Sequence, residues 1–379
     1  NLAQGKRRVA QINITQSLFV PALLIVLLSA LLILCHKPLL LLLGTPPELM
    51  VPAREYLVWF TLFLTPLAVF NILMFIVRLD GAPRFAMACN IMAASINIVL
   101  DYLFIFEFGW GLAGAAIATG VGYIVGSGVM LRYMLRHSRT LHFVKFKTSY
   151  KSLRLTARNL GYMTYIGFPA LLSELAISCL MVVGNYTFIR YTGKDGVAAY
   201  SIACYIFPII FMVYNGIIQS AQPIISYNYG ARKPERVKKT IRLAVFYAEC
   251  IMLVGFCIFQ FLPDKLLGLF AASDAMLAIG VPALRIICPH FLLAGAGIVL
   301  SSVFQALGNG VFSLTVSICR QLVVLIPAAW LLSRTGEVNM VWWAFIIAEV
   351  ASLALSLVFM ARINRTVIVP LSEKQDAAV

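Results

Sequence analysis

Three polar side chains inside long apolar stretches have the types and the spacing to bind a small cation. Asn97 and Asp101 are four residues apart and therefore share one face of a helix, and Thr119 follows in the next apolar stretch. A carboxylate at bilayer depth costs about 2.5–3.5 kcal/mol on insertion scales, so such a residue indicates function by default. An aspartate, an amide and a hydroxyl that face one cavity can hold a proton or a sodium ion. These residues favour an ion-coupled membrane transporter.

The composition predicts an integral membrane protein. The chain has 379 residues, of which 61% are hydrophobic and only 12% charged, whereas soluble domains average about 45–50% apolar and about 25% charged residues. The net charge of +15 would suggest nucleic acid in a soluble chain. Here the basic residues gather between apolar stretches, where they act as a sorting signal and contact the lipid bilayer, so we expect no nucleic acid. The eight cysteines form no CxxC pair, and we expect no metal cluster or cofactor.

Ten apolar runs are long enough, at about 20 residues, to cross a bilayer as helices. No run alternates apolar and polar residues as a barrel strand would, so the predicted fold is all-α. Most Lys and Arg residues fall on one side of the bilayer when the N-terminus is placed in the cytoplasm, which sets the orientation. The runs lie at 15–43, 53–77, 85–106, 112–135, 163–189, 196–221, 240–262, 276–304, 312–333 and 340–361.

A weak internal repeat relates the two halves of the chain. Gly5–Val9 resembles Lys233–Val237, and further on Arg78–Gly81 aligns with Gln305–Gly308. Six spans separate the two basic segments, so the repeats run parallel. Two helices precede the basic segment of the second repeat and none precedes that of the first. We therefore expect two further helices before Asn1, twelve in all; a genuine ten-helix protein is the alternative.

The repeat predicts two pseudo-symmetric helical lobes. The N-terminal lobe is expected at 1–136, with four of six helices present, and a cytoplasmic linker at 137–158. The C-terminal lobe is expected at 159–365, with six helices, and a cytoplasmic tail at 366–379.

Five sequence segments, in order, resemble one family. Asn97–Asp101 and then Gly111–Thr119 resemble the fifth and sixth helices of the multidrug and toxic compound extrusion (MATE) family. Ile166–Pro169 resembles the opening of its seventh helix. Gln222–Arg232 resembles its eighth helix and the following loop, and Arg320–Pro327 resembles the eleventh helix of its bacterial MepA-like branch. The likeness covers the whole chain, from the loop after the family's second helix.

The resemblance implies a monomeric, multi-pass antiporter of the bacterial inner membrane. Such a protein exports cationic or amphipathic drugs in exchange for H⁺ or Na⁺ and contributes to antibiotic resistance. The resemblance also implies that Ala115 joins Asn97, Asp101 and Thr119 in the cation site. The aspartate that some branches carry on helix 10 has no match in the stretch Leu293–Ile298, which puts a second cation site there in doubt.

Further polar residues lie at helical spacing within apolar runs of the second half. They either line a cleft that attracts a cationic drug or hold helices together by hydrogen bonds. Arg320 needs a buried partner, for which Glu249 and Glu349 are the candidates, and we expect His290 to be a structural histidine. The candidate substrate residues are Glu174, Ser178, Asn185, Asn215 and Gln219.

Three alternatives remain open. A lipid-linked precursor flippase of the same superfamily would need a strongly basic cleft, whereas the charges within the apolar runs are mostly acidic. A membrane-embedded enzyme would need paired catalytic groups such as His with Asp, or a HExxH or GxSxG element; none occurs, so we expect no catalytic residue. The third alternative is an inactive truncated fragment.

Overall fold

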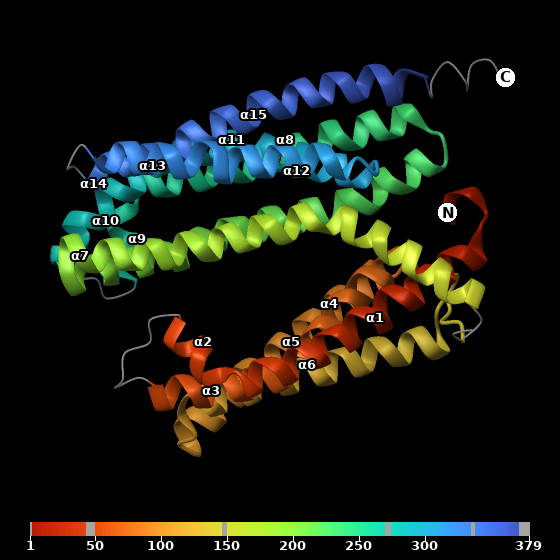
Figure 1. The fold of residues 1–379 in the computed structure, drawn as a ribbon, viewed down its shortest axis with the longest axis horizontal. Helices are drawn as coiled ribbons and strands as arrows, with labels where there is room; N and C mark the ends of the chain where they lie inside the picture. The colour runs from red at the N-terminus through yellow and green to blue at the C-terminus, as the bar shows by residue number, and fades with distance from the viewer. Residues whose placement is uncertain (1, 43–49, 146–149, 270–273, 335–337, 371–379) are drawn as a thin grey trace. The chain divides into compact units, whose positions relative to one another are not determined.

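The computed structural model describes residues 2–42, 50–145, 150–269, 274–334 and 338–370. These residues form helices joined by turns, and none of them lies in a strand, which confirms the all-α prediction (Figure 1). The chain divides into two compact units, Asn1–Met163 and Thr164–Val379. The predicted lobe and linker boundaries at 136, 158 and 365 stay predictions.

The described residues of unit 1 form six α-helices and two short irregular turns of helix, and the unit also takes in the first residues of α7. After the short 3₁₀ turn η1 (Leu2–Gln4), its elements are α1 (Arg7–Leu34), α2 (His36–Leu42), α3 (Met50–Leu62), α4 (Leu64–Leu79), α5 (Pro83–Tyr102), the π-helix η3 (Leu103–Glu107) and α6 (Gly111–Arg136).

Unit 2 holds most of α7 (Tyr150–Gly230) and the helices after it. They are α8 (Pro234–Phe261), α9 (Pro263–Gly268), α10 (Asp274–Ile287), α11 (Pro289–Ala306), α12 (Gly310–Ile318), the π-helix η4 (Cys319–Leu325), α13 (Ile326–Ser333), α14 (Val338–Val341), α15 (Trp343–Ile363) and the π-helix η5 (Asn364–Ile368).

Several predicted spans are interrupted. Among the described residues, seven helices are long and apolar enough to cross a membrane, or eight when the pair α3 and α4, bent by 44°, counts as one span. The predicted run 276–304 breaks at Cys288, because Pro289 begins α11 and has no N–H to continue the helix before it. The predicted run 15–43 begins earlier, at Arg7, and its long helix ends at Leu34.

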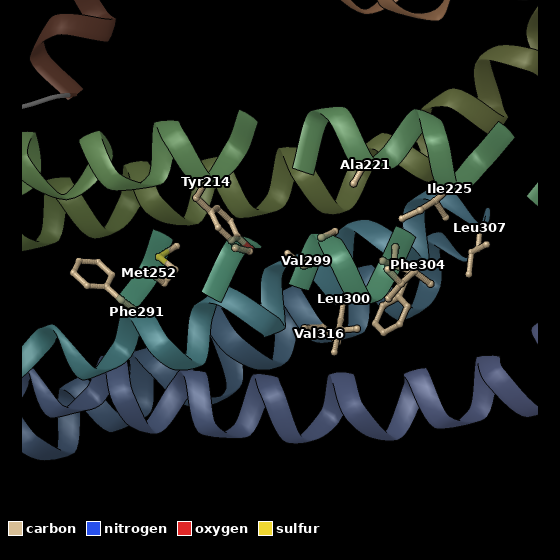
Figure 2. Close-up of a cluster of buried hydrophobic side chains, with 14 of the residues drawn as sticks. Tyr214, Ala221, Ile225, Met252, Phe291, Val299, Leu300, Phe304, Leu307 and Val316 are labelled. Atoms are coloured by element: carbon tan, nitrogen blue, oxygen red, sulfur yellow. The ribbon is translucent and has the colours of Figure 1, made fainter. Parts of the chain in front are cut away.

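One helical element, α7, replaces the two helices expected at 163–189 and 196–221. It has 81 residues, and a straight helix of that length would extend about 120 Å, four times the hydrocarbon thickness of a bilayer. The element is not straight: its yellow first part and green second part run alongside each other in Figures 1 and 2. The single element α7 therefore covers both expected spans.

The two units repeat each other in a constant register. Helices α1 and α8 both have 28 residues and begin at Arg7 and Pro234. The same register relates the ends of α4 and α11, the starts of α5 and α12, and the ends of α6 and α15. Gly81 and Gly308, which the sequence alignment paired, both take a positive φ, +90° and +81°. The alignment predicted at the basic segments is wrong by one position, since Gly5 matches Arg232 and both have positive φ.

Each unit has an apolar core of its own. In unit 1, Phe70, Leu73 and Val77 of α4 pack with Ala93 of α5 and Met130 of α6. In unit 2, Figure 2 shows Tyr214 pointing from α7 into the core that includes Met252 of α8 and Val299 of α11. Because lipid tails are as apolar as these side chains, close van der Waals packing holds each core together, and each unit has a core of its own.

Candidate cation-binding site

Glycines on α6 bring α5 close to it and so position the candidate site. A Cβ added at Gly122 would lie 2.7 Å from the carbonyl oxygen of Ala93 on α5, and one added at Gly126 would lie 2.5 Å from the Phe70 ring on α4. Only a residue without a side chain permits such an approach. The Gly122-x-x-x-Gly126 pair therefore forms a close helix contact, as its spacing predicted, one turn from Thr119.

The structure brings the three predicted cation ligands together. The Asn97 amide nitrogen donates to Asp101 Oδ2 at 3.0 Å and to Thr119 Oγ1 at 3.2 Å. The Thr119 hydroxyl donates in turn to the carbonyl oxygen of Ala115 at 2.9 Å. These bonds form a chain from α6 to α5 that fixes one carboxylate oxygen of Asp101.

The other carboxylate oxygen is available. Asp101 Oδ1 is buried and has no hydrogen-bond partner within the described part of the chain. A buried acceptor left unpaired is costly, so the arrangement favours a proton or cation on this atom. Asn97 presents its nitrogen and not its oxygen, so binding a metal ion through Asn97 would need the amide turned over.

The backbone changes character beside this carboxylate. Helix α5 ends at Tyr102 and continues as the π-helix Leu103–Glu107. π-helical turns are rare, and they occur frequently at functional sites because the extra residue per turn re-aims neighbouring side chains. The following turn contains Gly109 and Gly111 with positive φ, and it returns the chain into α6, which carries Ala115 and Thr119.

The five candidate substrate residues all lie on α7, and the structure describes the side chains of four of them. Glu174 and Ser178 are both exposed on α7, and the Ser178 hydroxyl donates to the Glu174 carbonyl oxygen at 3.0 Å. Asn215 is exposed and Gln219 is half-buried on the later part of α7. The side chain of Asn185 lies outside the described residues. Neighbouring Gln222 donates to Gln305 of α11 at 3.4 Å, which fits the alternative that these amides join helices.

The buried charges of unit 2 form a set that the sequence predicted only in part. Arg320 Nη1 lies 3.3 Å from Glu349 Oε1, which confirms the expected ion pair. His290 Nε2 lies 3.3 Å from the same oxygen, a contact that was not predicted. His290 and Glu349 lie on different helices, far apart along the chain, so no periodic signal links them and only the packing of α11 against α15 could reveal the contact.

Asp80 was missed as well. This side chain, only 3% exposed, accepts hydrogen bonds of 2.8–3.0 Å at both oxygens. Burial alone would raise the pKa of this carboxyl, but hydrogen bonds from three backbone N–H groups and a tyrosine hydroxyl hold its pKa below the ordinary 3.8. Asp80 thereby fastens the segment after α6 to the end of α4. The donors are Tyr133, Arg139, Thr140 and Leu141.

Comparison with known proteins points to one family. A family model described as MatE matches residues 1–103 and 169–331. The multidrug export protein MepA of Staphylococcus saprophyticus is 28% identical over 306 residues, which are 79% of this chain and 66% of the relative. MepA of Staphylococcus aureus, bovine strain RF122, is 26% identical over the same shares. The chain thus spans just under two thirds of the length of these relatives.

Solved structures share the fold. The outward-facing conformation of a multidrug resistance MATE family transporter superposes with a TM-score of 0.85 at 23% identity, covering 98% of this chain and 81% of that one. A MOP superfamily transporter from Pyrococcus furiosus gives the same TM-score at 24% identity and the same shares, and its binding pocket is described as having reversed polarity that suggests a different function. The fold therefore does not identify the transported molecule, and function has to be argued from side chains.

Proposed function

Because this chain belongs to the MatE family, we propose that it is a secondary active antiporter that exports cationic or amphipathic drugs in exchange for H⁺ or Na⁺. The family and the apolar helices agree with a multi-pass location in the bacterial inner membrane. The two staphylococcal relatives are named multidrug export proteins, and neither is named as an enzyme. Small molecules, the coupling ion and the bilayer are the partners that this function requires.

The observation that carries the proposal is the buried, unpaired oxygen of Asp101. Asn97 and Thr119 hold the carboxylate in place, and Oδ1 has no partner in the described ranges. Capture of a cation there relieves the unfavourable burial of a charge. A captured cation drives transport only if the two conformations of the transporter bind it with different affinities, and the adjoining π-helix is a segment that can repack between them.

Between the two ions, the observed geometry supports the proton. A sodium ion needs several oxygen ligands, but the Asn97 amide offers its nitrogen and the Thr119 oxygen already accepts from it. A proton needs only Asp101 Oδ1. Exposed Glu174 on α7 supplies a negative charge that would attract a cationic drug, with Ser178, Asn215 and Gln219 as further contacts.

Vesicles containing the purified protein test the proposal. We expect ethidium efflux to follow an imposed pH gradient, with a sodium gradient having little effect, and Asp101→Asn to lower ion-driven efflux at least tenfold. Glu107→Gln is the matched control, because Glu107 is an exposed carboxylate in the adjacent π-helix. Undiminished, ion-dependent efflux by Asp101→Asn would refute the site. Efflux by the unmodified protein that depends on neither gradient would refute antiport.

A further inference from the structure

Unit 2 contains a set of buried and half-buried titratable side chains that the proposed site in unit 1 does not use. Helix α11 contributes His290, η4 contributes Arg320, α15 contributes Glu349 and α8 contributes Glu249. His290 and Arg320 both lie 3.3 Å from one oxygen of Glu349. We call these four residues the α11 cluster.

Each residue of the α11 cluster has one buried polar atom without a hydrogen-bond partner in the described part of the chain. Glu349 is 3% exposed and His290 is 9% exposed. Glu349 Oε2, His290 Nδ1, Arg320 Nε and Glu249 Oε1 are all buried without a hydrogen-bond partner among the residues that the structure describes. Buried polar atoms in native proteins are nearly always paired, so four together indicate that something else occupies the cluster in some state of the protein.

Gly295 on α11 makes room for the Glu249 carboxylate, and Gly297 lies beside the Glu349 carboxylate. A Cβ added at Gly295 would lie 2.5 Å from Glu249 Oε1, and one added at Gly297 would lie 3.8 Å from Glu349 Oε2. Both glycines belong to the stretch Leu293–Ile298, which lacks an acidic residue. The neighbouring helices α8 and α15 therefore bring carboxylates against a stretch of α11 that has none of its own.

The repeat shows that the fold does not need these charges. In the register that pairs α1 with α8, Arg320 and Glu349 correspond to Ala93 and Gly122 of unit 1, which meet in a close backbone contact. The same helix crossing therefore forms with small residues alone. Because a buried ion pair is often no more stable than an apolar replacement, stability does not explain why unit 2 carries the cluster.

The charges in the cluster do not balance. Arg320 is a cation, and with both glutamates ionised and His290 neutral the net charge is −1. A carboxylate only accepts hydrogen bonds, so His290 Nε2 carries the hydrogen that faces Glu349, and Nδ1 keeps a lone pair. One proton on Nδ1 neutralises the cluster and gives a positive imidazolium in contact with Glu349, which favours it.

We propose that the α11 cluster is a second proton-binding site, in which His290 Nδ1 accepts one proton while Glu249 and Glu349 balance the charge. The proposal rests on the proposed antiport and extends it: protons would be exchanged at two places, one in each unit. The other groups that face α11 are the Tyr214 hydroxyl, which donates to the Gly295 carbonyl oxygen at 3.0 Å, and the rings of Phe211 and Phe345. Arg285 of α10 is exposed. The fixed positive charge of Arg320 opposes a metal ion in the same space.

The protonation state of His290 can be followed directly by nitrogen NMR of the full chain labelled at its four histidines. His290→Gln assigns the signal, and His137→Gln, which removes an exposed histidine, is the control. We expect His290 to carry its hydrogen on Nε2 at high pH and to take up one proton as the pH is lowered. Glu249→Gln should move the midpoint to lower pH, because it removes a negative charge from the cluster.

Three outcomes would overturn the proposal. They are a His290 that stays neutral down to pH 5, a midpoint that Glu249→Gln leaves unchanged, and a midpoint that moves when sodium chloride replaces choline chloride. The last would assign the cluster to sodium. Size-exclusion profiles that match the parent protein ensure that the variants compared are folded.

A second measurement separates this proposal from the antiport itself. Tetraphenylphosphonium added to the weakly buffered protein should release protons, read by a pH dye, and His290→Gln should release about one fewer than the parent. No release from the parent protein refutes proton exchange, while the NMR titration still decides whether the cluster binds a proton. Release that Asp101→Asn reduces and His290→Gln does not refutes the second site alone.

Discussion

Replacing Asp80 by asparagine should loosen the segment after α6 from the rest of unit 1. One carboxylate oxygen, Oδ1, accepts from the Thr140 backbone, the Thr140 hydroxyl and the Leu141 backbone, at 2.8–3.0 Å. The other, Oδ2, accepts from Tyr133 at 3.0 Å and Arg139 at 2.8 Å. An asparagine can keep the first three bonds with its oxygen, but its amide nitrogen then faces two donors.

The expected loss follows from that count. A hydrogen bond to a charged group contributes about 1.5–3 kcal/mol, and a buried donor left unpaired costs about 1–3 kcal/mol. Because the Tyr133 hydroxyl can rotate away, we expect Asp80→Asn to lower the free energy of unfolding by about 2–4 kcal/mol. Thr140→Val removes one bond only, so about 1 kcal/mol is expected.

The pH dependence has a definite sign. The pKa of Asp80 is lowered in the folded protein, because the hydrogen bonds outweigh burial. A carboxyl with a depressed pKa stabilises the fold above its unfolded-state pKa of about 3.9 and loses that contribution as the pH falls through its folded value. The difference between the parent and Asp80→Asn should therefore be constant near neutral pH and shrink below about pH 4.

Both effects can be measured by heating the protein in detergent and recording the fraction that stays monodisperse. About 2–4 °C of midpoint per kcal/mol is usual for larger domains, so Asp80→Asn should melt several degrees lower. Asp264→Asn, at an exposed aspartate of α9, is the control and should change the midpoint by about a degree or two. An Asp80→Asn midpoint within one degree of the parent at neutral pH would refute the anchoring role.

Two further pairs of substitutions test helix packing and the buried ion pair. Gly122→Ala places a Cβ 2.7 Å from the Ala93 carbonyl oxygen, so α5 and α6 must separate; a loss of about 1–3 kcal/mol in unfolding free energy is expected, and coupled transport should weaken with it. Gly128→Ala on the same helix has open space and should be neutral or slightly stabilising in the same melts; equal effects of the two would contradict the packing argument. Glu349→Gln removes the carboxylate that lies 3.3 Å from both Arg320 and His290 and should cost about 3–5 kcal/mol. Combining Glu349→Gln with Arg320→Leu should recover part of that loss, and a double variant less stable than the single one would contradict an ion pair.

The first candidate site was predictable because its signal is local. Asn97 and Asp101 lie one helical turn apart, and the glycines that bring Thr119 to them sit on the same short hairpin of helices. The cost of placing a carboxylate in a bilayer singled out Asp101, and the helical spacing showed that Asn97 lies on the same face of the helix. The direction in which the Asn97 amide points was not predictable, since both ends of an amide fit the same spacing and only the contacts around it decide between them.

The elements were predictable in outline and not at their breaks. Apolar length locates a span, but it does not show where the helical hydrogen bonding is interrupted. The break before Pro289 had a visible cause that the continuous apolar run concealed. The break at Phe63 and the π-helix before Ile326 have comparable signals in Pro66 and Pro327, which lack the N–H that a regular helix would need there. The π-helix after Tyr102 has no proline beside it.

By itself, the sequence determined that this protein is a membrane-embedded helical repeat with an acidic residue buried in its first half. Those properties follow from transfer free energies and from spacing along one chain, and both are local. Only the tertiary structure decided which distant groups share a buried space: Asp80 with the turn after α6, and His290 with Glu349 and Arg320. Contacts between helices depend on how side chains of different sizes fill a crossing, and no periodicity within either helix encodes that outcome.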